Sequence, residues 1–255
     1  NMASEAFGLT AYYDAIVSEW FNRDIGLDFP ERKTFFGKKI SQLRYGENPH
    51  QKSSIYFNSL KNENINLQQL SGKDLSYNNY NDIFASLEIL FSNLKSPSTV
   101  IVKHANPCGV SSNKSAFQSF LNAQASDPIS AFGGIVACNY KINNKIAQKI
   151  NKTFFEVILA KGFDKKALKI LKKKKNMRVI DISKFSYESK TTGKFFDNSF
   201  LLQEKDNLVF QKKMLKCVTK NKPSSRELKD IEFAFRICKY VKSNAVVIVK
   251  DNSTI

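Results

Sequence analysis

The residues with the clearest chemical potential lie at positions 102–110, where a lysine and a histidine directly follow an apolar run. In open α/β sheets, side chains just beyond the carboxyl end of a strand line the ligand crevice. His104 can exchange protons near neutral pH there, and the adjacent Lys103 favours the neutral imidazole that acts as a base. The alternative is a partly buried histidine bonded to a loop carbonyl, beside a turn made by Pro107 and Gly109.

A second group of chemically capable residues occupies positions 43–51. Arg44 carries a guanidinium that can grip a phosphate through two parallel hydrogen bonds, and Tyr45 offers a ring that can stack on a heterocycle. Gly46 lets the backbone approach a ligand closely. Composition alone leaves this segment as a polar loop, and His50 is interpreted as structural.

Three further polar segments flank the predicted helices and strands, at residues 72–82, 126–134 and 242–245. In the first, the amide of Asn79 can either bind a ligand or cap the helix that follows, which is the usual function of asparagine at such a position. The last contains Asn244. Both 126–134 and 242–245 lie at junctions between a helix and a strand, so turn formation is an equally simple explanation for them.

The formal charge of +17 raises the alternative of a basic module that binds nucleic acid or polyphosphate. Only six of the 40 basic residues are arginines, however, whereas base recognition relies heavily on arginine. The lysine run at 172–175 follows a helical pattern and is interpreted as a solvated helix end. We therefore expect no nucleic-acid partner and take the charge as background that steers an anionic substrate.

Metal-dependent chemistry is not indicated by the four cysteines and two histidines. None of the cysteines forms a C-x-x-C pair or lies beside a histidine at ligand spacing, so we expect free thiols and no metal. A zinc-dependent deaminase would need three ligands, a His or Cys together with a C-x-x-C pair, and a glutamate. No run of about 18 apolar residues and no secretory signal occurs, so we expect no membrane partner and a cytoplasmic location.

Hydrophobic periodicity predicts an amphipathic helix at residues 4–21, a linker up to about residue 39, and alternating strands and helices beyond it. The predicted strands cover residues 99–103, 134–138, 155–160, 178–182 and 245–249, and the predicted helices cover 82–94, 115–125, 143–152, 165–174 and 226–241. Ser224 and Glu227 have the spacing of a capping box, and Asp164 can cap another helix. Residues 183–213 are predicted as loops plus a hairpin. This alternation is typical of an α/β domain with a mixed or largely parallel sheet.

The order of the polar segments resembles one family, the bifunctional AICAR formyltransferase/IMP cyclohydrolases. Seven motifs carry the resemblance in order, over nearly all of residues 43–255: RYGENPHQ, GKDLSYNN, VKHANPCGV, SDPISAFGGIVA, EVILAKGF, VTKNKPSSREL and YVKSNAVV. Seven ordered matches are far more specific than a single glycine motif. The segment LTAYYD at 9–14 also resembles the closing helix of the cyclohydrolase domain.

The resemblance implies a domain plan and a fold. Residues 1–24 would be the terminal helix of a truncated cyclohydrolase domain, 25–42 a linker, and 43–255 the first half of the formyltransferase domain. That domain is built from cytidine-deaminase-like three-layer α/β units, without zinc. The family continues past this sequence with a glycine-rich turn and a second α/β half, so we expect this chain alone to have no cyclohydrolase activity and little or no formyl transfer.

The resemblance also implies a reaction in de novo purine biosynthesis, in which the 5-amino group of AICAR takes the formyl group of 10-formyltetrahydrofolate. An aromatic amine is a poor nucleophile, so a base must remove its proton as the bond forms. The matching positions make His104 that base, Lys103 the cation that assists the leaving folate nitrogen or stabilises developing charge, and Asn244 the group that holds the formyl oxygen. The expected nucleotide-binding residues are Arg44, Tyr45, Gly46, Asn79 and Gly162. The family implies a homodimer with sites between subunits.

Overall fold

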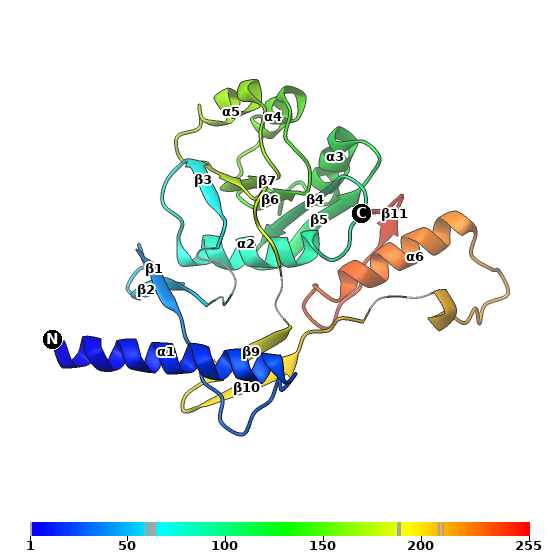
Figure 1. Ribbon diagram of the computed structural model, residues 1–255. Helices are drawn as coiled ribbons and strands as arrows, with labels where there is room; N and C mark the ends of the chain where they lie inside the picture. Colours follow the sequence, from blue (N-terminus) through cyan, green and yellow to red (C-terminus); the bar gives the residue numbers. More distant parts are fainter. Residues whose placement is uncertain (1, 59, 61–64, 188–189, 209, 211) are drawn as a thin grey trace.

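The computed structural model describes residues 2–58, 60, 65–187, 190–208, 210 and 212–255. Its main body is a mixed sheet with helices on both faces (Figure 1). The alternation of strands and helices predicted from the sequence is therefore confirmed as a mixed α/β architecture. The finer resemblance to a cytidine deaminase unit stays a prediction.

The sheet has eight strands in the order β11-β12-β5-β4-β6-β7-β8-β3. Their bounds are β3 Gln68–Ser71, β4 Ser98–Lys103, β5 Asn106–Ser112, β6 Ile135–Cys138, β7 Val157–Ala160, β8 Arg178–Asp181, β11 Val249–Lys250 and β12 Ser253–Thr254. Parallel pairing joins β6 to β7 and β7 to β8, whereas every other ladder of this sheet is antiparallel. Of the two predicted alternatives, the mixed sheet is confirmed and the largely parallel sheet is wrong.

Two apolar layers hold the helices to the sheet. Helices α3 (Ala116–Ser126), α4 (Asn144–Ile150) and α5 (Lys165–Leu171) cover one face, while α2 (Tyr77–Leu90) and α6 (Ser225–Cys238) cover the other (Figure 1). Successive side chains of a strand point to opposite faces, so Ile101 of β4 belongs to the first layer, and Val100 and Val102 belong to the second. Burial on both faces explains why these strands are continuous apolar runs in the sequence.

Helix starts are fixed by local side-chain bonds. Ser224 and Glu227 form the predicted capping box, with Ser224 N donating to Glu227 Oε2 at 2.7 Å and Glu227 N donating to Ser224 Oγ at 3.3 Å. The cap predicted at Asp164 is wrong in one respect. Asp164 occupies the N-cap position of α5, but its side chain makes no capping bond and instead pairs with Lys141 Nζ at 2.9 Å.

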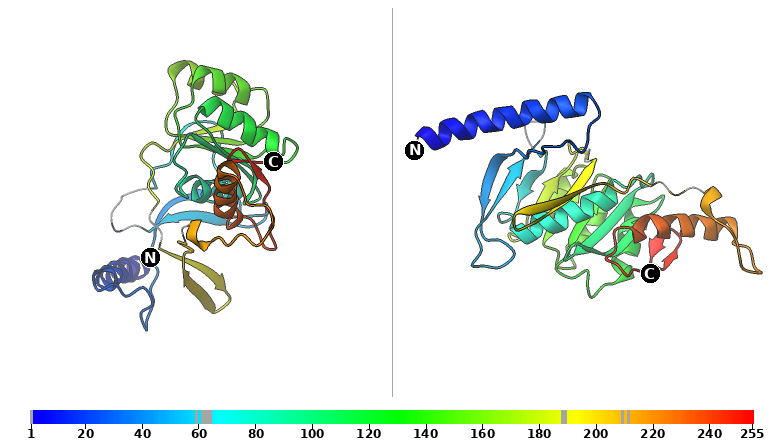
Figure 2. Two further views of the ribbon diagram at one scale, coloured as in Figure 1. Left: turned by 90° about the vertical axis from the view of Figure 1, so that its right-hand side faces the viewer. Right: turned by 90° about the horizontal axis from the view of Figure 1, so that it is seen from below.

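Several elements lie outside the sheet and its helices: α1 (Met2–Asp24), the pair β1 (Lys38–Leu43) and β2 (Ser53–Phe57), the hairpin β9 (Thr191–Phe196) and β10 (Ser199–Glu204), and the short 3-10 turn Lys212–Met214. The predicted first helix and the predicted hairpin are thus confirmed. Figures 1 and 2 show α1 as a long rod beside the main body. Ala15 is its one buried residue among those described.

A helix followed by a hairpin with a two-residue turn occurs twice among the described residues. The first unit is α2, β4 and β5, and the second is α6, β11 and β12. Both helices begin with a capping box. In both units the tetrapeptide VIVK directly precedes the turn, at residues 100–103 and 247–250. The two hairpins lie side by side in the sheet, because β12 pairs with β5.

Candidate active site

Most of the polar segments lie along one edge of the sheet, the side on which β4 ends and β6, β7 and β8 begin. Register places Val102 opposite Ile135, Ile135 beside Val157, and Val157 beside Arg178. Strand β4 therefore ends at the edge where β6, β7 and β8 begin. The sequence predicted that His104 lies in a crevice at the carboxyl ends of parallel strands. The structure instead places it where β4 ends and the three strands β6, β7 and β8 begin.

His104 and Ala105 form the two-residue turn that connects β4 to β5, because Lys103 pairs with Asn106. Both turn residues have positive φ, 55° and 54°, the pattern of a type I′ hairpin. Neither is a glycine or an asparagine, and a left-handed backbone costs other residues about 1–2 kcal/mol each. His104 is exposed, and its imidazole makes no hydrogen bond with the described residues. The alternative of a buried histidine bonded to a loop carbonyl is therefore wrong.

Asp82, on the second turn of α2, binds the backbone of this hairpin turn. Its Oδ2 accepts the amide N–H of His104 at 3.2 Å, and its Oδ1 accepts that of Ala105 at 2.7 Å. Hydrogen bonds to a carboxylate are stronger than those between neutral groups. The carboxylate thus stabilises a backbone conformation that the sequence of the turn does not favour.

Lys103 and the segment 242–244 approach the same turn. Lys103 Nζ donates to the carbonyl oxygen of Phe132 at 3.0 Å, which ties β4 to the predicted turn segment 126–134. Lys242 donates from its backbone N to Asn106 Oδ1 and from its Nζ to the His104 carbonyl oxygen, both at 3.4 Å. The peptide bond between Ser243 and Asn244 is cis, and Asn244 is exposed. Asn244 thus follows directly after the residues that contact the His104 turn.

The loop with Arg44 and Tyr45 is joined to the start of α2. Asn78 Nδ2 donates to the Glu47 carbonyl oxygen at 3.2 Å. Within the loop, Gly46 N donates to the Gln51 carbonyl oxygen at 2.7 Å, and a Cβ on Gly46 would lie 2.8 Å from the Cβ of Gln51. The close approach explains the glycine. The Arg44 guanidinium lies 5.2 Å from the centre of the Tyr45 ring, so the two proposed nucleotide-binding side chains are neighbours.

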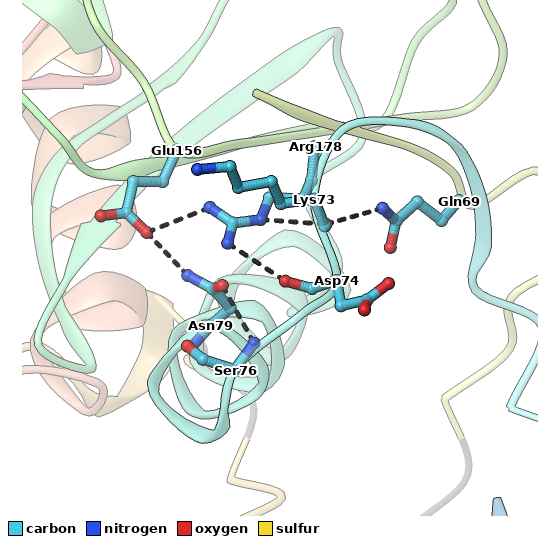
Figure 3. Close-up of polar contacts among 7 residues, drawn as sticks. All are labelled: Gln69, Lys73, Asp74, Ser76, Asn79, Glu156 and Arg178. Atoms are coloured by element: carbon cyan, nitrogen blue, oxygen red, sulfur yellow. Dashed lines mark hydrogen bonds and ion pairs between the residues drawn. The ribbon is translucent and has the colours of Figure 1, made fainter. Parts of the chain in front are cut away.

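Asn79 is buried in a polar network at this edge (Figure 3). Its Oδ1 accepts Ser76 N at 3.1 Å in the capping box of α2, and its Nδ2 donates to Glu156 Oε2 at 2.8 Å. Arg178 lies 3.6 Å from the same Glu156 oxygen. The capping function that the sequence offered for Asn79 is therefore confirmed, and one N–H of its amide remains for a ligand.

Arg178 anchors the loop after β3 to the start of β8 (Figure 3). Its Nε donates to the Lys73 carbonyl oxygen at 3.2 Å and its Nη2 to the Asp74 carbonyl oxygen at 3.1 Å. Gln69 Nε2 donates to the same Lys73 oxygen at 2.8 Å. These bonds bring residues 72–79 to the edge that holds His104.

Gly162 lies at the opposite edge of the sheet. It follows β7, whose last residue Ala160 pairs with Cys138 of β6, and Cys138 pairs with Thr99 at the start of β4. His104 follows the other end of β4. The structure therefore separates Gly162 from His104 within one chain.

The segment 126–134 adds apolar surface and a thiol to the edge. Ile129 is 86% exposed and Phe132 57% exposed, next to the carbonyl that Lys103 binds. Burial raises the pKa of the Cys108 thiol to about 11, and the negative charge of Asp127 acts in the same direction. Donation from Ser130 holds the pKa of Asp127 below its usual value. Cys108 is therefore a protonated, weakly nucleophilic thiol at neutral pH.

Two hollows lie away from this edge. One, of about 570 Å³, is lined by Glu88, Tyr187, Lys205, Arg236 and Tyr240, among others. The other, of about 920 Å³, lies between residues 215–223, α6 and residues 247–249. None of the residues that line them comes from the turn at His104 or the loop at Arg44.

Neither a metal-binding cluster nor a membrane-spanning helix occurs in the described ranges. His, Cys, Asp and Glu side chains in these ranges nowhere form a group of three able to hold a metal ion. Measured against the thickness of a bilayer, every helix in them falls short in length or in apolar character.

The sequence matches one family of known proteins over its whole length. The model of the AICARFT/IMPCHase bienzyme family matches residues 1–255. The chain belongs to this family. It is 42% identical over 255 residues to the bifunctional purine biosynthesis protein PurH of Thermoanaerobacter sp. (strain X514), covering all of this chain and 50% of that protein. The PurH protein of Clostridioides difficile (strain 630) is 39% identical over 263 residues, again with all of this chain and 50% of the relative covered.

The chain spans about half the length of the curated relatives it matches. The family membership inferred from the seven motifs is thus confirmed. Sequence reasoning missed four residues that organise the edge: Asn78, Asp82, Glu156 and Arg178. Asn78 and Asp82 lie in the segment 72–82 that the sequence singled out, and Glu156 begins the motif EVILAKGF. Their contacts were missed because a polar residue on the outer side of a helix, or at the amino end of a strand, looks solvated in a sequence.

Proposed function

We propose that this chain contributes to formyl transfer from 10-formyltetrahydrofolate to the 5-amino group of AICAR, in de novo purine biosynthesis. Membership of the AICARFT/IMPCHase bienzyme family supports the reaction class. The observation that carries the proposal for this chain is that His104, Lys103, the Arg44 loop and the Asn244 segment meet at one edge of the sheet.

In the proposed mechanism, His104 takes the proton of the attacking amine. A bond forms between the amine nitrogen and the formyl carbon while the bond from that carbon to the folate nitrogen breaks, so one proton leaves the amine and one must reach the folate nitrogen. The exposed and unbonded imidazole of His104 is free to accept the first. Lys103 lies beside it and retains donors for the leaving nitrogen or for developing charge. Asn244 would hold the formyl oxygen.

The nucleotide would be held by the loop that Asn78 joins to α2. Arg44 can bind the phosphate bidentately, Tyr45 can stack on the heterocycle, and Gly46 keeps the backbone turn tight. Asn79 has one amide N–H left for the ligand. Gly162 would contribute only across an interface, from a second chain.

The reduced folate is a co-substrate that supplies the formyl group when bound. Its flat pterin would pack on the exposed side chain of Phe132, whose carbonyl oxygen binds Lys103 Nζ. We also propose that a homodimer completes the site and that this chain alone transfers little or no formyl group and has no cyclohydrolase activity. A cytoplasmic location and the cytidine-deaminase-like unit are parts of the same proposal.

The test compares His104→Ala and Arg44→Ala within the full-length protein. We expect His104→Ala to lower kcat about 100- to 10,000-fold with AICAR binding retained, because it removes the base. Arg44→Ala is expected to weaken AICAR binding, measured by calorimetry, because it removes the phosphate contact. Turnover that survives His104→Ala would refute the proposal. Binding to RNA that weakens steeply as the salt concentration rises, and that neither substitution changes, would favour the alternative of a basic module that binds nucleic acid.

A further inference from the structure

Two carboxylates in this chain make the same contact with two different hairpin turns. Asp82 accepts the N–H groups of His104 and Ala105, and Asp230 accepts those of Asp251 at 3.0 Å and Asn252 at 2.7 Å. Each aspartate lies six residues after the N-cap serine of its helix, Ser76 for α2 and Ser224 for α6. All four turn residues have positive φ. The carboxylate contact is therefore a device that the fold uses twice.

The two turns differ in what they carry. Asp251 and Asn252 are residue types that tolerate a left-handed backbone, and the Asp251 side chain pairs with Arg226. His104 and Ala105 are less suited to that conformation, and the His104 side chain is left exposed. The turn at His104 thus depends more on its aspartate, and it presents a reactive group instead of a closed ion pair.

We propose that Asp82 is a positioning residue for formyl transfer, which fixes the direction of the His104 imidazole by holding the β4–β5 turn in its left-handed conformation. The proposal rests on the proposed function of His104. Asp82 binds the backbone amides of His104 and Ala105, which lie on either side of the His104 α-carbon. Loss of the Asp82 carboxylate would therefore rotate the His104 side chain away from the substrate amine. Misplacement of a catalytic group by about 1 Å can reduce a rate about 100-fold.

The experiment compares Asp82→Asn with Asp230→Asn within the full-length protein. An asparagine offers one acceptor and turns a donor toward the second amide, so both substitutions weaken the same kind of turn. We expect Asp82→Asn to lower kcat about 10- to 100-fold while KM for AICAR changes less than about threefold. Asp230→Asn is expected to lower the thermal midpoint of unfolding by about as much as Asp82→Asn does, while its kcat changes less than about twofold.

A backbone rescue separates positioning from general stability. Glycine adopts positive φ without a steric cost, so Ala105→Gly added to Asp82→Asn should recover about tenfold of the lost kcat. If Asp82→Asn folds poorly, Asp82→Glu keeps both acceptors on a longer side chain and is expected to show an intermediate kcat.

Amide hydrogen exchange provides a readout that needs no turnover and uses this chain directly. Asp82→Asn should accelerate exchange at His104 and Ala105, and Asp230→Asn should do so only at Asp251 and Asn252. The proposal is overturned if Asp82→Asn leaves kcat or this exchange unchanged, or if both aspartate substitutions lower kcat equally. A parallel His104→Ala control that remains active would instead refute the proposed function itself.

Discussion

Asn78 and Asp82 lie one helical turn apart on α2, and each binds the backbone of a different loop of the proposed site. Asn78 donates to the Glu47 carbonyl oxygen of the Arg44 loop, and Asp82 accepts two amides of the His104 turn. Residues four apart share one face of a helix. The first two turns of α2 are therefore the common support that brings the proposed nucleotide-binding loop and the proposed base to the same edge.

The link through Asn78 predicts an effect on nucleotide binding. Asn78→Ala removes one hydrogen bond to the loop, worth about 1 kcal/mol, so we expect the Kd for AICAR to rise about fivefold with little change in kcat. Asn81→Ala is the matched control, because Asn81 is exposed on the same helix and makes no hydrogen bond with the described residues. Calorimetry on the full-length protein would measure both. Equal affinities in the two variants would contradict the link.

The strands that sequence predicted best are those buried on both faces. Residues 99–103, 134–138 and 155–160 all contain a strand, because a continuous apolar run has few alternatives to the interior of a sheet. In the predicted strand at 245–249, only Val249 belongs to a strand, β11, since the β12 ladder includes Val249 and Lys250 alone among the described residues. Pairing is a property of two segments, and one segment does not reveal it.

The segment that sequence missed most clearly is β5, which pairs with both β4 and β12. Its residues 106–112 include Pro107, Gly109 and two serines, which are typical of a turn. His104, Lys103 and Arg44 were proposed as site residues because their types and order are informative. The edge of the sheet on which they lie could not be predicted from the sequence, because it depends on β6 running antiparallel to β4.

The network around Asn79 predicts a repairable loss of stability. Asn79→Asp keeps the acceptor for Ser76 N but places a second carboxylate against Glu156, so we expect the free energy of unfolding to fall by about 2 kcal/mol. Adding Glu156→Gln supplies an N–H donor and should restore most of that loss. Denaturant titration of this chain tests the pair. A double variant no more stable than Asn79→Asp alone would show that repulsion by Glu156 is not the cause.

Gly109 predicts a steric limit between β5 and α3. A Cβ at this position would lie 1.9 Å from the carbonyl oxygen of Ala123, which is backbone and has little freedom to move. We expect Gly109→Ala to reduce the free energy of unfolding by at least about 3 kcal/mol. Gly8→Ala in α1 is the control, because nothing lies within 4 Å of its Cβ and alanine favours a helix by up to about 1 kcal/mol. Thermal unfolding of both variants should therefore shift in opposite directions.

The cysteines predict an order of alkylation that depends on pH. Only the thiolate reacts, and burial raises the pKa of Cys108 to about 11 and that of Cys138 to about 12. At pH 8, about one Cys108 side chain in a thousand is then ionised. Cys217 is exposed and should react first with iodoacetamide. Modification of Cys108 should rise as the pH approaches 11. Peptide mass mapping after timed labelling measures each site, with all four thiols reacting in guanidinium as the control. Labelling of Cys108 as fast as Cys217 at pH 8 would mean that the edge beside Lys103 is not packed as described.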